Sequence, residues 1–111
     1  MQSSEKMDLT VIIVNWNTGQ LLSECVQSLK SEIKDINSQI IIIDNKSSDE
    51  SVRQAKQSFP ELIYIDNSVN GGFAKANNQG LQIAKGQFIL FLNPDTRVQP
   101  NSIHILLHFL Q

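Results

Sequence analysis

The sequence predicts an α/β fold, an open and mostly parallel β-sheet with helices on both faces. Apolar, strand-like runs alternate four times with amphipathic stretches along the 111 residues, which is the order of successive βαβ units. The apolar runs are also continuous, which is typical of strands that are buried on both faces of a parallel sheet. We expect residues 1–8 to be a polar N-terminal tail and residues 9–111 to be the folded domain.

The first half of the domain contains two strand–helix pairs. The β-branched run Leu9–Val14 predicts a strand, and the next apolar positions recur at the spacing of one buried helix face. Those positions are Leu21, Leu22, Cys25, Val26, Leu29 and Ile33. The run Ile40–Ile43 predicts the second strand. Ser47 and Glu50 have the spacing of a capping box, which predicts a helix from there to about Ser58.

The second half repeats this order. Leu62–Ile65 predicts a third strand, and a helix is expected to follow the Asn70–Gly72 turn until Gly86 closes it. Phe88–Leu92 predicts the fourth strand, and a last helix begins near Pro100. Four residues of that helix form one apolar face and two more are apolar on other sides. They are Ile103, Leu106, Leu107 and Leu110, then Ile105 and Phe109. Such a helix needs neighbours, so we expect either a longer natural chain or a homodimer through this helix.

The composition restricts the kinds of partner. With a formal net charge of −2, the chain has no basic surplus to neutralise phosphates, so we expect no nucleic-acid partner. No apolar run approaches the ~20 residues that cross a bilayer, and the N-terminus lacks the apolar stretch of a signal peptide. We therefore expect a cytoplasmic protein.

Polar side chains follow all four predicted strands. They are Asn15 and Asn17, then Asp44 and Asn45, then residues 67–72, and finally Asn93 and Asp95. In open parallel sheets ligands bind beyond the carboxyl ends of the strands, so this pattern favours a binding site at one edge. Asn and Asp are also common turn residues, which is the structural alternative for any one of them. The motifs G-x-G-x-x-G and G-x-x-x-x-G-K-[ST] are absent, which argues against dinucleotide oxidoreductases and P-loop NTPases.

The residue types at these ends suggest particular tasks. Asp95 follows a buried strand directly and suits Mg²⁺ or Mn²⁺ shared with phosphate oxygens, or else it opens an Asx-type turn. Asp44 can accept the N3–H of uracil or thymine, or cap its own loop. Gly71 and Gly72 let the backbone approach a ligand closely. Asn77 either satisfies a buried loop carbonyl or helps to hold the ligand-binding loop.

Four strings resemble, in order and spacing, the inverting family 2 glycosyltransferases with the GT-A fold. They are VIIVNWN (residues 11–17), IIIDNKSSDES (41–51), NGGFAKANNQGL (70–81) and FILFLNPDT (88–96). The resemblance implies a Rossmann-like half of that fold and transfer of a sugar from a nucleotide diphosphate-sugar to an acceptor hydroxyl. The acceptor would be a glycan or a lipid-linked sugar. The resemblance would also place the protein in the cytoplasm or peripherally at the inner face of the membrane.

The resemblance also implies where the base lies. Val14, Asn15 and Asn17 would border the base and ribose. Asp44 would bind the pyrimidine, and Asn45 beside it belongs to the same set of nucleotide-sugar contacts.

For the diphosphate and sugar, the resemblance implies residues 70–78, with Gly71, Gly72 and Asn77. Asn93-Pro94-Asp95 stands where the family has its DxD motif, with Asp95 as the matching metal-binding carboxylate and Asn93 in place of the first Asp. The NPDT form is similar to that of bacterial rhamnosyltransferase-like members, which implies a dTDP- or UDP-sugar donor. The family's general base and acceptor-binding part are expected beyond Gln111, so no catalytic residue is assigned.

Two rival functions remain. A nucleotidyltransferase also places carboxylates at strand ends, but it should carry a Gly-rich loop with a basic residue after the first strand, where this chain reads NWNTGQ. The second rival is a non-catalytic nucleotide-binding or assembly module, paired through the last helix.

Overall fold

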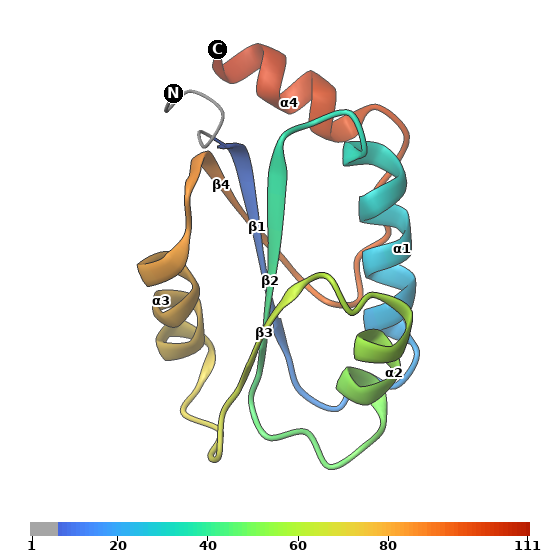
Figure 1. Ribbon diagram of the computed structural model, residues 1–111, viewed down its shortest axis with the longest axis vertical. Coiled ribbons are helices and arrows are strands. Elements are labelled where there is room, and N and C mark those ends of the chain that lie inside the picture. Colours follow the sequence, from blue (N-terminus) through green and yellow to red (C-terminus); the bar gives the residue numbers. More distant parts are fainter. Residues whose placement is uncertain (1–6) are drawn as a thin grey trace.

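The computed structural model describes residues 7–111, in which strands and helices alternate strictly (Figure 1). In chain order they are β1 (Met7–Asn15), α1 (Leu21–Ile33), β2 (Ser38–Asp44), α2 (Ser51–Ser58), β3 (Ile63–Asp66), α3 (Phe73–Ile83), β4 (Gly86–Leu92) and α4 (Ser102–Leu110). Residues 1–6 of the expected tail lie outside the described residues. Met7 and Asp8 belong to β1 instead of the tail, because Met7 pairs with Gly86 and the Asp8 N–H donates to the Asn37 carbonyl at 2.9 Å.

The strands form one parallel sheet in the order β3-β2-β1-β4. Helix α3 covers one face, and α1, α2 and α4 lie on the other (Figure 1). The predicted α/β fold, a parallel sheet with helices on both faces, is therefore confirmed. Since all strands run the same way, their carboxyl ends and the loops that follow them share one edge of the sheet.

The core explains why the apolar runs are continuous. Successive residues of a strand point to opposite faces. From β1, Val11 and Ile13 pack toward α1 and α2, whereas Ile12 and Val14 pack toward α3. β2 divides its isoleucines in the same way. Both inner strands thus carry apolar side chains along their centres, and their polar residues lie toward the strand ends.

The start of α2 differs from the prediction. The Ser47–Glu50 capping box is wrong, because α2 begins at Ser51 and Glu50 makes no side-chain capping bond. Ser47 is used elsewhere: its hydroxyl donates to the Asp44 carboxylate at 2.6 Å. The carboxylate of Asp49 instead accepts the Ser51 N–H at 3.1 Å, so the first turn is held from the residue before Glu50.

The sequence pattern predicted that Gly86 closes α3, and this prediction is wrong. The helix ends at Ile83, and Gly86 is the first residue of β4. A Cβ added there would lie 2.4 Å from the Thr10 amide nitrogen and 2.6 Å from the Leu9 carbonyl carbon. The glycine is required because β4 enters the sheet against the backbone of β1, where the Thr10 hydroxyl accepts the Gly86 N–H at 2.8 Å.

The predicted apolar face of α4 is only half buried. Ile103 and Leu107 pack in the core beside α1, but Leu106 and Leu110 are 42% and 51% exposed, and Phe109 is exposed as well. The reason is that α4 packs mainly against α1 among the helices, so only a narrow strip of its surface is covered. Among residues 7–111, no helix is both long and apolar enough to cross a bilayer.

We expect Gly86→Ala to lower the free energy of unfolding by about 1–3 kcal/mol, the usual cost of adding atoms to a packed site. The added methyl group would meet backbone atoms of β1, which cannot move without disturbing the ladder. Urea unfolding followed by circular dichroism measures the loss. Gln87→Thr, at the exposed neighbouring position, is the control and should change stability by no more than about 0.5 kcal/mol. Equal stability of the two variants would contradict the close approach of β4 to β1.

Candidate functional site

A buried asparagine joins the carboxyl ends of β1 and β2. Asn15 lies opposite Asp44 in the ladder and is fully buried. Its Nδ2 donates to Asp44 Oδ1 at 3.0 Å and to Ser51 Oγ at 2.9 Å. Its Oδ1 accepts the Thr18 hydroxyl at 2.5 Å. The polar atoms of Asn15 are thus paired within the protein, so this residue holds two loops together and offers no free group to a ligand.

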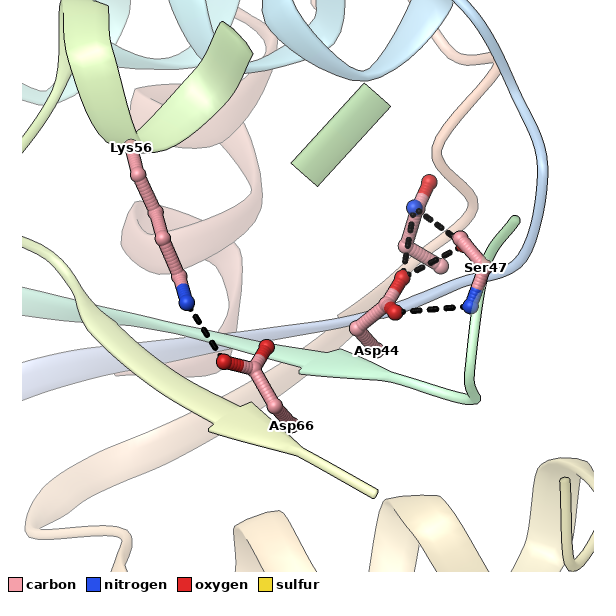
Figure 2. Close-up of polar contacts among 5 residues, drawn as sticks. Asp44, Ser47, Lys56 and Asp66 are labelled. Atoms are coloured by element: carbon pink, nitrogen blue, oxygen red, sulfur yellow. Dashed lines mark hydrogen bonds and ion pairs between the residues drawn. The ribbon is translucent and has the colours of Figure 1, made fainter. Parts of the chain in front are cut away.

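Asp44 is enclosed by the loop that follows it (Figure 2). Its Oδ2 accepts the Ser47 N–H at 2.8 Å, and its Oδ1 accepts the Ser47 hydroxyl at 2.6 Å as well as the Asn15 amide. The residue is 5% exposed. A carboxylate has about four lone-pair sites, so these contacts occupy most of its accepting capacity. Of the two tasks considered for Asp44, capping its own loop is the one whose contacts are present here.

A second set of bonds ties the loop after β1 to the loop after β2. Asn17, which is exposed and has φ 52°, accepts the Ser48 N–H on Oδ1 at 2.7 Å. The Gly19 N–H donates to Asp49 Oδ2 at 2.9 Å. A hydrogen bond from the Ser51 hydroxyl lowers the pKa of Asp49 below its usual range, and the backbone N–H groups of Ser51 and Gly19 lower it further. These bonds give the two loops a fixed relative position at the edge of the sheet.

Asn45 points to the opposite face from Asp44, because neighbouring residues leave an extended chain on opposite sides. Its Nδ2 donates to the Gly72 carbonyl at 3.2 Å, and its Oδ1 accepts the Asn67 amide at 3.0 Å. Asn67 and Gln79 exchange two amide hydrogen bonds, of 2.8 and 2.9 Å. Asn45 therefore fixes the glycine turn before α3 to the end of β2.

A pocket of about 170 Å³ opens on this α3 side of the edge. Its lining residues are Asn45, Asn67, Ser68, Val69, Gly71, Gly72, Lys75, Ala76 and Gln79. Gly72 has φ +96°, which favours glycine there. The side chain of Lys75 lies across Gly71, where an added Cβ would be 3.0 Å from Lys75 Cδ. Lys75 forms no ion pair or hydrogen bond within residues 7–111, so the pocket has one free positive charge. Neither Asp44 nor Asp95 lines it.

Two other predicted site residues, Val14 and Asn77, do not line this pocket. Val14 is buried in the core under α3, beside Ala76. Asn77 is half-buried, but the sheet-facing positions of α3 are Ala76 and Gly80, not Asn77. The close contact of Gly80 with Ile12, 2.9 Å from an added Cβ, brings α3 down onto β1. The side chain of Val14 and the start of α3 are thereby held at the same edge as the pocket.

The Asn93–Thr96 segment forms a tight turn directly after β4. The Thr96 N–H donates to the Asn93 carbonyl at 3.0 Å, and both Asn93 and Asp95 are exposed. The carboxylate of Asp95 has no partner among residues 7–111. Behind the turn lies Cys25, whose buried thiol donates weakly to the Asn93 carbonyl at 3.7 Å. Burial, with a smaller contribution from the charge of Asp95, raises the pKa of Cys25 to about 11, so the thiol is neutral at pH 7.

Asp95 is the one predicted metal ligand, and its surroundings fit a cation that arrives with a phosphate. Within residues 7–111 no group of three or more His, Cys, Asp or Glu side chains could hold a metal by itself. Mg²⁺ commonly binds through one or two carboxylates, with substrate phosphates and waters completing its shell. The free Asp95 carboxylate could hold Mg²⁺ or Mn²⁺ in that shared manner.

Sequence reasoning missed several residues that build this edge. Ser47, Ser51 and Asp49 were not predicted to serve the site, and Lys75 and Gln79 were not singled out. Lys75 had a usable signal, since it is the third residue of the helix that starts after Gly72. The serines had none, because their hydrogen bonds join loops about 30 residues apart in sequence.

Comparison with known proteins identifies the family. The model of the family described as glycosyl transferase family 2 matches residues 10–111. The chain belongs to glycosyl transferase family 2. The poly(ribitol-phosphate) beta-glucosyltransferase of Bacillus spizizenii is 34% identical over 94 residues, which are 80% of this chain and 15% of that protein. The minor teichoic acid biosynthesis protein GgaB of Bacillus subtilis is 31% identical, over 97% of this chain and 12% of that protein.

Solved structures of the same architecture agree with this family 2 domain in fold. The structure of Staphylococcus aureus TarS 1–349 in complex with UDP-GlcNAc has a TM-score of 0.82 and 23% identity, and the match covers 94% of this chain and 31% of that one. The mannosyltransferase PcManGT from Pyrobaculum calidifontis, in complex with GDP-Man and Mn²⁺, has a TM-score of 0.70 and 22% identity, over 83% and 28%. The match to this domain therefore covers less than a third of the length of each of these two chains.

We expect Asn15→Ala to destabilise the domain by about 2–4 kcal/mol, because it leaves the buried Asp44 carboxylate and the Thr18 and Ser51 hydroxyls with fewer partners. Thermal and urea unfolding measure the loss. Asn17→Ala removes an amide from the exposed part of the same loop and is the control, with a loss of about 1 kcal/mol or less. If the two variants were equally stable, Asn15 would not be the residue that joins the loops.

Asp49 gives the domain a defined dependence on pH. Its pKa is lowered by folding, so its contribution to stability is present above the ordinary Asp pKa of about 3.9 and is lost as the pH falls through the lower, folded value. Asp49→Asn should therefore be less stable than the parent at neutral pH, and the difference should shrink toward pH ~3. Urea unfolding at a series of pH values measures it, with Glu50→Gln as the control for removing a charge from the same loop. A difference that did not change with pH would contradict this role.

Proposed function

We propose that this chain is the donor-binding part of a glycosyltransferase that transfers a hexose from a UDP- or dTDP-sugar to a hydroxyl of a glycan or lipid-linked acceptor, with inversion. The observation that carries the proposal is the meeting of polar loops from four parallel strands at one edge of the sheet, where ligands of such sheets bind. Family membership supports sugar transfer over the nucleotidyltransferase alternative. The NPDT form of residues 93–96 supports these donors.

The diphosphate would lie between the glycine turn and the turn after β4. Lys75 supplies a free positive charge, and the first amides of α3 point outward from Gly72 at the same edge. Asp95 would hold Mg²⁺ or Mn²⁺ together with the phosphate oxygens. Bound there, the metal would neutralise the negative charge that grows on the leaving diphosphate. Asn93 carries no charge, so Asp95 would be the only anionic protein ligand of this turn.

The base and ribose would lie over the ends of β1 and β2. Asn17 is exposed there, whereas Asn15 and Val14 are buried and would act by fixing the loops. Asp44 retains limited capacity to accept the N3–H of a pyrimidine, and Asn45 reaches the pocket side of the edge. Gly71, Gly72 and Asn77 belong to the segment that would line the sugar and diphosphate.

The titles of the structural neighbours support a nucleotide sugar and a divalent metal as ligands. TarS 1–349 was solved with UDP-GlcNAc, and PcManGT with GDP-Man and Mn²⁺. In inverting transfer a general base takes the proton of the acceptor hydroxyl while the nucleoside diphosphate leaves from the opposite face of the sugar. No residue of this chain is assigned as that base, and we propose that the protein lies in the cytoplasm or peripherally at the inner face of the membrane.

A second candidate function is assembly through α4. Ile105, Leu106, Phe109 and Leu110 are all exposed on that helix, which favours contact with another apolar surface. The expected arrangement is a homodimer through α4. Light scattering on the chain would distinguish a dimer from a monomer. A dimer without nucleotide binding would favour assembly over donor binding.

We expect the chain to bind UDP and dTDP more tightly with Mn²⁺ than with EDTA, because the cation bridges Asp95 and the diphosphate. Isothermal titration measures the affinity. Asp95→Asn should reduce it to the metal-free value, since the amide cannot replace the lost negative charge.

Asp66→Asn is the matched control, because Asp66 is an exposed carboxylate at the same edge of the sheet that pairs with Lys56 (Figure 2). Its metal dependence should equal that of the parent. No metal-dependent binding of either nucleotide by the parent would refute the proposed donor site, and an unchanged Asp95→Asn variant would refute the assignment of the metal.

A further inference from the structure

The segment after β4 is attached to one stripe of α1. The Asn93 carbonyl accepts the Cys25 thiol, Arg97 pairs with Glu24 at 2.7 Å, and the Val98 N–H donates to Ser28 Oγ at 2.9 Å. Two further contacts lie toward the end of α1 and beyond it. The Asn101 N–H donates to the Glu32 carboxylate at 2.7 Å, and the His104 ring lies 2.9 Å from the Asp35 carboxylate.

The spacing of these contacts makes α1 a regular support. Glu24, Ser28 and Glu32 are four residues apart, so they stack on one side of the helix. Their partners Arg97, Val98 and Asn101 follow in the same order, so the segment runs alongside α1 in the same direction (Figure 1). The opposite side of α1 carries buried residues that pack on the sheet, which fixes the helix itself.

Asp95 lies between two of these attachments. Its own carboxylate is exposed and has no partner within residues 7–111, so its side chain is free for a ligand. Its backbone is held on one side through the Asn93 carbonyl and on the other through the Val98 N–H, and the Arg97 side chain adds an ion pair with Glu24. A free carboxylate on a fixed backbone is the arrangement that lowers the entropic cost of binding a cation.

We propose that the Glu24–Ser28 part of this α1 stripe positions Asp95, so that Ser28 and Glu24 determine how tightly the chain binds a metal–nucleotide complex. Neither residue touches the ligand: Ser28 acts through the backbone N–H of Val98, and Glu24 acts through the side chain of Arg97. This inference rests on the proposed donor site. It adds that the affinity of the metal site depends on a helix outside that site.

Ser28 is the most informative of the positioning residues. Its hydroxyl donates to the Cys25 carbonyl at 2.9 Å, one turn back along α1, which orients its lone pairs toward the Val98 N–H. Alanine at this position cannot accept a hydrogen bond, whereas threonine keeps a hydroxyl on the same atom. The pair Ser28→Ala and Ser28→Thr therefore separates the hydrogen bond from the bulk of the side chain.

The test measures Mn²⁺-dependent UDP affinity by isothermal titration, with melting temperature recorded for every variant. Ser28→Ala should weaken UDP binding with Mn²⁺ by about two- to tenfold, the range expected for one lost hydrogen bond. The affinity of Ser28→Ala for UDP in EDTA should equal that of the parent. The Ser28→Thr variant should bind UDP with Mn²⁺ as tightly as the parent does. Glu24→Gln, an exposed change that cannot unfold the domain, should weaken the same metal-dependent binding in the same direction.

Glu32→Gln is the matched control, because Glu32 belongs to the same stripe but holds Asn101, six residues beyond Asp95. It should lower the melting temperature without changing the Mn²⁺-dependent affinity. If Ser28→Ala and Glu24→Gln lost only stability, or if Glu32→Gln weakened metal-dependent binding equally, positioning by the stripe would be wrong.

A ligand-free measurement distinguishes this inference from the proposed function. In the Ser28→Ala variant the Thr96, Arg97 and Val98 amides should exchange with solvent faster than in the parent, as read by NMR. Faster exchange with unchanged metal affinity would refute positioning while leaving the donor site intact. Absence of any metal-dependent binding in the parent would refute both. Unchanged exchange would show that Ser28 does not hold the turn.

Discussion

The end of the β1–β2 ladder is the constraint on which the rest of the candidate site depends. There Asn15 lies directly opposite Asp44, and both side chains are buried on the α1 and α2 side of the sheet. A buried carboxylate needs hydrogen-bond donors, and Asn15 and Ser47 supply them. Meeting that need ties both strand ends together, because one partner is the last residue of β1 and the other lies in the loop after β2. Without this pairing the parallel sheet would still exist, but the two loops would lose the buried contacts that join them beneath the exposed bonds of Asn17 and Gly19.

The same constraint divides the edge into two faces with different tasks. Asp44 points inward to the helices, whereas Asn45 points to the α3 side and holds the Gly72 carbonyl. Hydrogen bonds that fix loops occur on both sides, and the pocket with the free charge of Lys75 lies on the α3 side. Adjacent polar residues of one short motif thus fix segments on opposite faces of the sheet: Asp44 fixes the loop after β2, and Asn45 fixes the glycine turn before α3.

The fold was predictable because it depends on patterns that a linear sequence records. Continuous apolar runs such as Leu9–Val14 identify buried parallel strands whichever strand lies beside them. The capping box at Ser47 and the helix end at Gly86 were wrong because each rested on a local motif, whereas the serine is bonded to Asp44 and the glycine is required by β1. Likewise, periodicity predicted the apolar residues of α4 but not which of them would be covered, because that depends on how few neighbours α4 has. The roles of the site residues stay predictions, since periodicity cannot tell a loop cap from a base contact.

The attachment of the segment after β4 shows a further limit of sequence reasoning. Glu24, Ser28 and Glu32 read as the solvated face of an amphipathic helix, and nothing in their spacing distinguishes them from any other polar stripe. Their partners lie about 70 residues away. Once β4 is placed next to β1, the chain travels back past α1 to reach α4, and the polar stripe accepts two of its backbone N–H groups on the way. The order β3-β2-β1-β4 thus places the turn containing Asp95 beside α1, and the position of that carboxylate follows from the topology of the sheet as much as from the turn itself.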